Sequence, residues 1–130
     1  METIWILGAT GKGGRAIASE LIGTNAEVVL VGRDHDRLAA TAASPGGRAR
    51  TVLASGPAEV ATLIAAEKPT VVVNTIGPFG ETSAPLARAC VAAGTHYVDL
   101  ANELPPVQAV LDMDADARRE GVTLVTGAGF

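Results

Sequence analysis

This sequence has little of what disulfides, membrane spans or a targeting leader require. Cys90 is the single cysteine among 130 residues, which excludes an intrachain disulfide and makes a reducing compartment the default. No apolar stretch approaches the length of a spanning helix, and Glu2 and Thr3 stand where a basic leader would begin. We therefore expect a cytoplasmic protein without a membrane partner.

Positive charge and metal-binding patterns are scarce as well. The formal net charge is −4, and neither phosphate backbones nor acidic lipids attract a chain of that sign, so we expect no nucleic-acid partner. The sequence has no Cys/His spacing typical of zinc and no Ser/His/Asp grouping typical of a hydrolase. We expect no metal site, and these patterns assign no catalytic residue.

What the chain does have is the material for one α/β domain. A hydrophobic content of 48% with 18% charged residues is typical of a compact globule rather than a disordered chain. Short Val, Ile and Leu runs alternate with alanine-rich helical patterns, which indicates a parallel sheet covered on both faces. Strands are predicted at Thr3–Leu7, Val28–Val31, Ala49–Leu53, Thr70–Asn74, His96–Leu100 and Val122–Thr126.

Helices are predicted between these strands from apolar spacing and end signals. Their expected limits are a start near Arg15 and an end at Gly23, an N-cap at Asp34 and a stop before Pro45-Gly46-Gly47, a start at Gly56-Pro57, an N-cap at Thr82 or Ser83, and a last helix over Pro105–Glu120. Such an alternation predicts a doubly wound parallel sheet with the strand order 3-2-1-4-5-6, in which Ala49–Leu53 lies at an edge.

The glycine-rich turn from Gly8 to Gly14 is the most informative stretch, because it lies between a predicted strand and a predicted helix. Gly8 permits a tight turn, Gly11 lets the backbone approach a pyrophosphate, and Gly14 lets the helix pack closely. The start of the helix offers unpaired N–H groups and a positive dipole end to phosphates. This context predicts a Rossmann dinucleotide-binding domain.

The end of the second predicted strand bears on the choice between NAD and NADP. An NAD site carries an acidic residue there for the ribose 2′-hydroxyl, whereas this chain reads Val31-Gly32-Arg33. A guanidinium binds a 2′-phosphate bidentately, and Gly32 leaves room for it. We therefore predict NADP as the cofactor, with NAD possible. The alternative is that Arg33 merely pairs with Asp34 or Asp36 on the surface.

A second ligand-facing loop is predicted at residues 74–80. Ligands of doubly wound sheets bind where the strand order reverses, so this loop should lie over the nicotinamide half of the cofactor. Asn74 is expected to bond a ribose or the neighbouring backbone, and an ordinary Gly-Pro turn is the alternative for the loop. The predicted cofactor contacts are Gly8, Thr10, Gly11, Lys12, Gly13, Gly14, Arg15, Gly32, Arg33, Asn74, Thr75, Gly77, Pro78 and Phe79.

Four stretches of the chain resemble the N-terminal NAD(P)-binding domain of the saccharopine dehydrogenase-like family, which includes saccharopine reductases and trans-acting enoyl reductases. They are residues 8–15, 31–33, 73–79 and 95–103, and the last two are the most specific. The resemblance implies hydride transfer to or from a small organic substrate, with residues 1–130 as the dinucleotide-binding part of a longer protein whose substrate domain is absent here. Such sequences usually carry an aspartate after the third strand, where this chain has Ala54 and Ser55.

Two other functions stay open from the sequence. A non-catalytic NADP-sensing protein of the atypical short-chain dehydrogenase type would lack a Tyr-x-x-x-Lys pair, as this chain does. A scaffold that has lost its cofactor is favoured by Ala54. Strand alternation places Tyr97 and Asp99 on one face and His96 on the other, where each also has an ordinary structural role. A homo-oligomer is possible.

Overall fold

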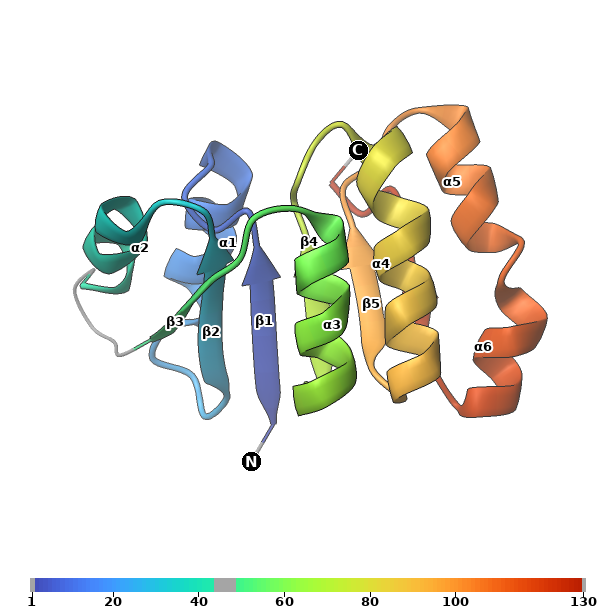
Figure 1. Cartoon of the computed structure of the whole chain (residues 1–130), viewed down its shortest axis with the longest axis horizontal. Coiled ribbons are helices and arrows are strands. Elements are labelled where there is room, and N and C mark those ends of the chain that lie inside the picture. Colours follow the sequence, from blue (N-terminus) through green and yellow to red (C-terminus); the bar gives the residue numbers. More distant parts are fainter. Residues whose placement is uncertain (1, 44–48, 130) are drawn as a thin grey trace.

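The computed structural model describes residues 2–43 and 49–129 of the chain. Within that range six parallel strands form one sheet in the order β3-β2-β1-β4-β5-β6, so the predicted doubly wound order is confirmed (Figure 1). The strands are β1 (Thr3–Leu7), β2 (Glu27–Gly32), β3 (Arg50–Leu53), β4 (Val71–Asn74), β5 (His96–Asp99) and β6 (Leu124–Val125). The strand β3 lies at an edge, as predicted.

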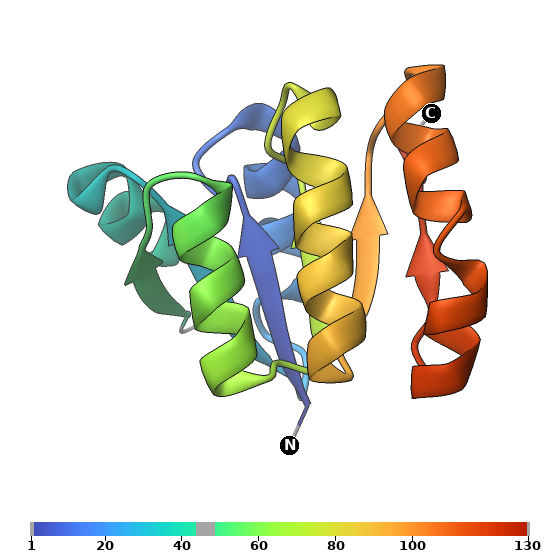
Figure 2. The ribbon, with the colours of Figure 1, turned by 45° about the vertical axis from the view of Figure 1, so that its right-hand side comes forward.

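The helices cover the sheet on both faces. They are α1 (Lys12–Leu21), α2 (His35–Ala42), α3 (Pro57–Glu67), α4 (Phe79–Ala93), α5 (Leu104–Leu111) and α6 (Asp114–Glu120). In Figure 1, α3 and α4 lie side by side in front of the sheet and α1 lies behind it. Figure 2 shows that α5 and α6 follow on the same side as α4. Because every strand is parallel, all strand-to-helix loops meet at one edge of the sheet.

Strand alternation divides the buried side chains into two layers. On β1, Trp5 and Leu7 point into the layer beneath α3 and α4, whereas Ile6 points into the layer beneath α1 and α2. The larger layer also takes Val29 of β2 and Tyr97 of β5. Trp5, Ile6 and Leu7 are fully buried, which is why the first predicted strand reads as a continuous apolar run.

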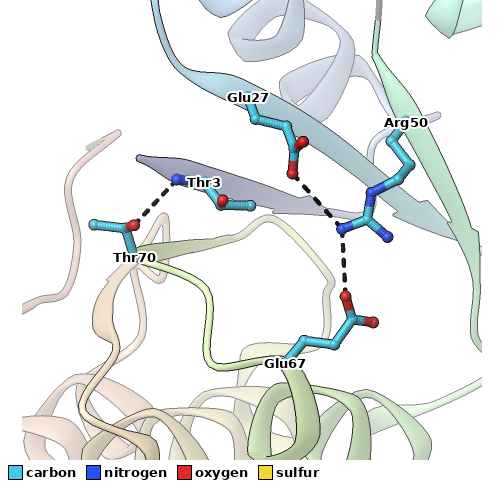
Figure 3. Close-up of polar contacts among 5 residues, drawn as sticks. All are labelled: Thr3, Glu27, Arg50, Glu67 and Thr70. Atoms are coloured by element: carbon cyan, nitrogen blue, oxygen red, sulfur yellow. Dashed lines mark hydrogen bonds and ion pairs between the residues drawn. The ribbon is translucent and has the colours of Figure 1, made fainter. Parts of the chain in front are cut away.

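The amino edge of the sheet is tied by polar contacts between elements that are distant in sequence (Figure 3). The guanidinium of Arg50, at the start of β3, lies 3.3 Å from a carboxylate oxygen of Glu67 and 3.8 Å from one of Glu27. The backbone N–H of Thr3 donates to Oγ1 of Thr70 at 3.0 Å. The Arg50 contacts join β2, β3 and the end of α3, and the Thr3 contact joins β1 to the residue before β4. Both lie on the side away from the strand-to-helix loops.

The starts of two helices differ from the prediction. The helix α1 begins at Lys12 rather than near Arg15, directly after the turn. The helix α4 begins at Phe79 with Pro78 as its N-cap, so neither Thr82 nor Ser83 caps it. Both hydroxyls lie inside the helix and donate to partners outside it, which a local capping pattern does not distinguish from a cap.

The end of the chain also differs from the prediction. The single helix predicted over Pro105–Glu120 is two helices, because Met113 N–H bonds to Val110 only three residues back and closes a tight turn. The predicted last strand is shortened to Leu124–Val125. The caps and starts predicted at Asp34 and Pro57 are confirmed. The turn predicted at Pro45-Gly46-Gly47 lies outside the described residues.

Candidate cofactor-binding site

A cleft of about 340 Å³ opens at the carboxyl edge of the sheet, beside the point where the strand order reverses. Its walls come from the ends of β1, β2, β3 and β4 and from the starts of α3 and α4. The lining residues are Gly8, Thr10, Val31, Gly32, Arg33, Ala54, Gly56, Pro57, Val60, Ile76, Gly77, Pro78, Glu81 and Thr82. This is the crevice in which doubly wound sheets bind ligands.

The turn between β1 and α1 is built so that backbone passes close to backbone. Gly8 has a φ of +75°, a conformation that L side chains rarely adopt. A Cβ added to Gly14 would stand 2.2 Å from the carbonyl oxygen of Gly8, so any side chain there would force the first turn of α1 away. The predicted roles of Gly8 in the tight turn and of Gly14 in close packing are confirmed.

The N-terminus of α1 has no side-chain acceptor for its first N–H groups. Its N-cap is Gly11, no side chain caps it, and no acidic residue occupies its first turn. The helix α2 is different, because Asp34 Oδ1 accepts the N–H of Arg37 at 3.1 Å. Uncapped N–H groups and the positive end of the helix dipole favour an anion at the start of α1. Lys12 and Arg15 are exposed at this end and do not line the cleft.

Arg33 follows β2 and lines both the cleft and a second hollow beside it. The other residues that line this hollow are Thr10, Asp34, His35, Asp36 and Arg37. Within residues 2–43 and 49–129, Arg33 forms no ion pair with Asp34 or Asp36. The surface-pair alternative is therefore not what the structure shows. Gly32 is close-packed, since a Cβ there would meet the Leu38 side chain at 3.2 Å.

The end of the cleft between β2 and β3 is apolar. Val31, Ala54 and Val60 are buried and line it. The hydroxyl of Ser55 donates to Oε2 of Glu59 at 3.3 Å on the surface and does not line the cleft. The sequence motifs do not single out Val60 as a lining residue. The position of Val60, one turn into the helix that follows the edge strand, is the sequence feature that could have indicated this role.

The loop after β4 supplies the opposite wall of the cleft through Ile76, Gly77 and Pro78. Asn74 and Thr75 hold this loop from beneath. Asn74 is fully buried, and its Oδ1 accepts the N–H of Ile76 at 3.0 Å, which is the bond to the neighbouring backbone that the sequence predicts. Thr75 Oγ1 donates to the carbonyl of Leu7 at 2.7 Å and so joins the ends of β4 and β1.

The remaining predicted contacts are placed around the same edge. Thr10 lines the cleft, Gly13 lies in the first turn of α1, and Phe79 begins α4 without lining the cleft. The sequence motifs also do not single out Glu81 and Thr82, which lie in the first turn of α4 and line the cleft. Six of the fourteen predicted contacts therefore line the cleft, namely Gly8, Thr10, Gly32, Arg33, Gly77 and Pro78. The other eight do not line it: Gly11, Lys12, Gly13, Gly14, Arg15, Asn74, Thr75 and Phe79.

Two titratable residues of β5, Tyr97 and Asp99, point away from the cleft, toward α4. Tyr97 and Asp99 are fully buried on one face, as predicted, and the Tyr97 hydroxyl donates to Asp99 Oδ2 at 2.7 Å. Burial raises the pKa of Tyr97 well above its usual range. Burial alone would raise the pKa of Asp99 too, but hydrogen bonds from Thr126, Tyr97, Ala101 and Gly127 outweigh it and lower that pKa.

Other reactive side chains are accounted for by packing or exposure. Cys90 is fully buried on α4, and burial raises the pKa of its thiol to about 12. His96 Nδ1 accepts the N–H of Thr123 at 3.0 Å, joining β5 to the segment before β6. Across residues 2–43 and 49–129, no group of His, Cys, Asp and Glu side chains could hold a metal ion. No helix in these ranges is long and apolar enough to cross a membrane.

The sequence is similar to those of mycobacterial proteins. A putative trans-acting enoyl reductase of Mycobacterium tuberculosis is 35% identical over an alignment of 133 positions, which covers 98% of this chain and 32% of that protein. A trans-acting enoyl reductase of Mycobacterium ulcerans is 33% identical over 135 residues, with the same coverage. The chain thus spans about a third of the length of these relatives.

Solved structures share the fold. Saccharopine dehydrogenase from Saccharomyces cerevisiae superposes with a TM-score of 0.77 at 14% identity, over 98% of this chain and 27% of that chain. The citronellol catabolism dehydrogenase of Pseudomonas aeruginosa gives a TM-score of 0.72 at 23% identity, over 96% of this chain and 72% of that chain. The family described as saccharopine dehydrogenase NADP binding domain matches residues 4–125. The chain therefore belongs to the saccharopine dehydrogenase NADP-binding domain family.

Proposed function

We propose that this chain binds NADP(H) in the cleft at the carboxyl edge of the sheet. The pyrophosphate would lie on the turn between Gly8 and Gly14, and the 2′-phosphate would lie at Arg33. The observation that carries the proposal is the uncapped start of α1, which stands directly behind a turn packed too closely to admit a side chain at Gly14. Such a turn presents backbone N–H groups to an anion.

The residues that are present suit each part of the cofactor. The dipole of α1 would stabilise the pyrophosphate by about 0.3–1 kcal/mol for each surface anion. Arg33 is exposed and lines the cleft, and Asp34 is engaged in capping α2. Buried Val31, Ala54 and Val60 offer an apolar wall to the flat base. Gly77 and Pro78 would face the nicotinamide half of the cofactor.

For the full-length protein we propose an oxidoreductase that transfers a hydride between NADP(H) and a small organic substrate. The names of the mycobacterial relatives make an enoyl group the first substrate class to test. Nicotinamide supplies the hydride chemistry when it is bound, and the protein supplies orientation and electrostatics. We propose that residues 1–130 are the dinucleotide-binding domain and that a further domain contributes the substrate contacts.

One observation favours a second function, binding of NADP without turnover. Of the titratable side chains in the described ranges, Arg33 and Glu81 are the two that line the cleft. Tyr97 and Asp99, which the sequence places near the same edge, are buried beneath α4. Oxidation of NADPH by the full-length protein with an enoyl thioester would support the reductase. Tight binding without oxidation of NADPH by any acceptor would support the sensor.

The test of cofactor choice is calorimetric titration of the chain with NADPH and with NADH. We expect NADPH to bind more tightly, because the 2′-phosphate gains charge-assisted hydrogen bonds from Arg33. The Arg33→Ala variant should lose about ten- to a hundredfold in NADPH affinity and little in NADH affinity. Equal affinities of the parent chain for the two cofactors would contradict the assignment of Arg33.

The matched control is Arg50→Ala. It also removes one partly exposed arginine, but from the amino edge of the sheet, away from the strand-to-helix loops (Figure 3). Its preference for NADPH over NADH should equal that of the parent chain. A loss of preference as large as that of Arg33→Ala would mean that net charge, rather than a contact at the 2′-phosphate, sets the selectivity.

A further inference from the structure

A buried carboxylate without a positive partner lies behind the cleft. Asp99, at the end of β5, is fully buried, and no Lys, Arg or His of the described residues forms an ion pair with it. Its charge is met by hydrogen-bond donors instead. Oδ2 accepts from Ser83 Oγ at 2.9 Å and from the Tyr97 hydroxyl at 2.7 Å. Oδ1 accepts from Thr126 Oγ1 at 2.7 Å and from the N–H groups of Ala101 and Gly127 at 3.1 Å.

Those donors come from segments that are far apart in the sequence. Ser83 belongs to α4, Ala101 to the loop after β5, and Thr126 and Gly127 to the turn after β6. A buried anion is costly unless its oxygens are hydrogen-bonded, so the ionised carboxylate favours the arrangement in which every donor stays in place. Asp99 therefore links three segments at the carboxyl edge of the sheet.

A directed chain of hydrogen bonds runs from Asp99 to the wall of the cleft. The Tyr97 hydroxyl donates to Asp99 and accepts from Nδ2 of Asn74 at 3.1 Å. Nδ2 of Asn74 also donates to Thr82 Oγ1 at 3.2 Å, and Thr82 Oγ1 donates to the carbonyl of Ile76 at 2.7 Å. Asn74 Oδ1 accepts the N–H of Ile76. Asn74 thus binds the backbone N–H of Ile76, and Thr82 binds its carbonyl oxygen.

We propose that Asp99 is a positioning residue that, through Tyr97 and Asn74, fixes the Ile76–Pro78 wall of the cleft. This wall faces the nicotinamide half of the cofactor in the function proposed above, on which the inference rests. In that function the adenosine half would lie against the ends of β2 and β3, and Asn74, Tyr97 and Asp99 do not line the cleft there. Loss of the Tyr97 link should therefore weaken binding of the nicotinamide half alone.

Ser83 supplies a matched control within the same cluster. Tyr97→Phe and Ser83→Ala each remove one hydroxyl donor from Asp99 Oδ2, but only Tyr97 continues to Asn74 and Ile76. A general loss of stability would affect both variants. An effect transmitted to the cleft would appear only in Tyr97→Phe. Melting temperatures of both variants show how far each is destabilised.

The experiment titrates the parent chain and both variants with NADPH and with 2′,5′-ADP, which lacks the nicotinamide half. We expect Tyr97→Phe to lose about tenfold in NADPH affinity, the equivalent of one hydrogen bond, and to keep its affinity for 2′,5′-ADP. Ser83→Ala should keep both affinities. Equal effects of the two substitutions on NADPH, or an equal loss of both ligands in Tyr97→Phe, would overturn the inference.

Amide hydrogen exchange of the chain without cofactor gives a second readout. Protection of the Ile76 N–H should fall in Tyr97→Phe and remain unchanged in Ser83→Ala, and unchanged protection in both would overturn the inference. Failure of the parent chain to bind either nucleotide would overturn the proposed function, while the exchange measurement would still test the hydrogen-bond chain. If Tyr97→Phe does not fold, Asp99→Asn replaces it, because it weakens the acceptor of the Tyr97 hydroxyl and leaves the lining of the cleft unchanged.

Discussion

At the scale of single residues, two side-chain-free positions and one buried charge shape the site. The sequence allowed the roles of Gly8 and Gly14 to be predicted, because a turn between a buried strand and a helix has few solutions. It did not reveal the five hydrogen bonds to Asp99. Its donors Ser83, Thr126 and Gly127 are distant in sequence, and no local pattern brings them together.

The close contact of Gly14 with Gly8 predicts the effect of adding a side chain at Gly14. Gly14→Ala should lower the free energy of unfolding by about 1–3 kcal/mol, because its Cβ would stand 2.2 Å from the carbonyl oxygen of Gly8 and force α1 to shift. Urea denaturation measures the change. Gly80→Ala is the control, since a Cβ there meets nothing within 4 Å and alanine favours helix. A Gly14→Ala variant as stable as Gly80→Ala would contradict the close approach.

The lowered pKa of Asp99 predicts an acid-sensitive fold. An unfolded aspartate takes up its proton near 3.8, whereas native Asp99 stays ionised to lower pH. Unfolding therefore binds a proton in this range, so the stabilisation is complete above the unfolded pKa and is lost as the pH falls through the native one. The free energy of unfolding is measured as the pH is lowered from neutral to below 3.8. It should fall less steeply with decreasing pH in Asp99→Asn than in the parent chain.

At the scale of elements, the presence and order of the strands and helices could be predicted, but the residues at which several of them begin or end could not. Val71–Asn74 is recognisable as a central strand because its β-branched run has no polar face. The predicted start of α4 was wrong because Thr82 and Ser83 are residue types that favour the N-cap position. Their hydroxyls instead bond to the preceding loop and to β5. Glu81 and Thr82 lie in the first turn of α4 and line the cleft.

The cap of α2 gives a prediction at this scale. Asp34→Ala removes the acceptor for the Arg37 N–H, so the free energy of unfolding should fall by about 1 kcal/mol. Asp34→Ser, which keeps a capping oxygen, should restore most of that loss. Thermal or urea unfolding of the three proteins provides the comparison. An Asp34→Ala variant as stable as the parent would mean that tertiary contacts of Leu38 alone hold the helix in place.

At the scale of the whole molecule, the two edges of the sheet have separate tasks. The amino edge carries the contacts of Arg50 with Glu67 and Glu27, which join strands and helix (Figure 3). The carboxyl edge carries the cleft and the loops around it. The strand order 3-2-1-4-5-6 could be predicted because parallel strands with short crossovers allow few topologies. The apolar end of the cleft between β2 and β3 could not be predicted, because it depends on how β3 packs beside β2.

This separation predicts what Arg50→Ala changes. The free energy of unfolding should fall by about 0–1 kcal/mol, because both ion pairs are partly exposed to solvent. The affinity for NADPH should remain that of the parent chain. Denaturation and calorimetry on the same preparation measure the two quantities. A large drop in affinity at constant stability would show that the two edges are coupled.

The central claim is that the cleft between the glycine turn and Arg33 holds NADP(H). A crystal structure of the chain grown with NADPH tests it most directly. We expect the pyrophosphate against the backbone of Gly11 to Gly14 at the start of α1 and the 2′-phosphate within hydrogen-bond distance of Arg33. A nucleotide bound elsewhere on the molecule, or one whose 2′-phosphate points away from Arg33, would contradict the account.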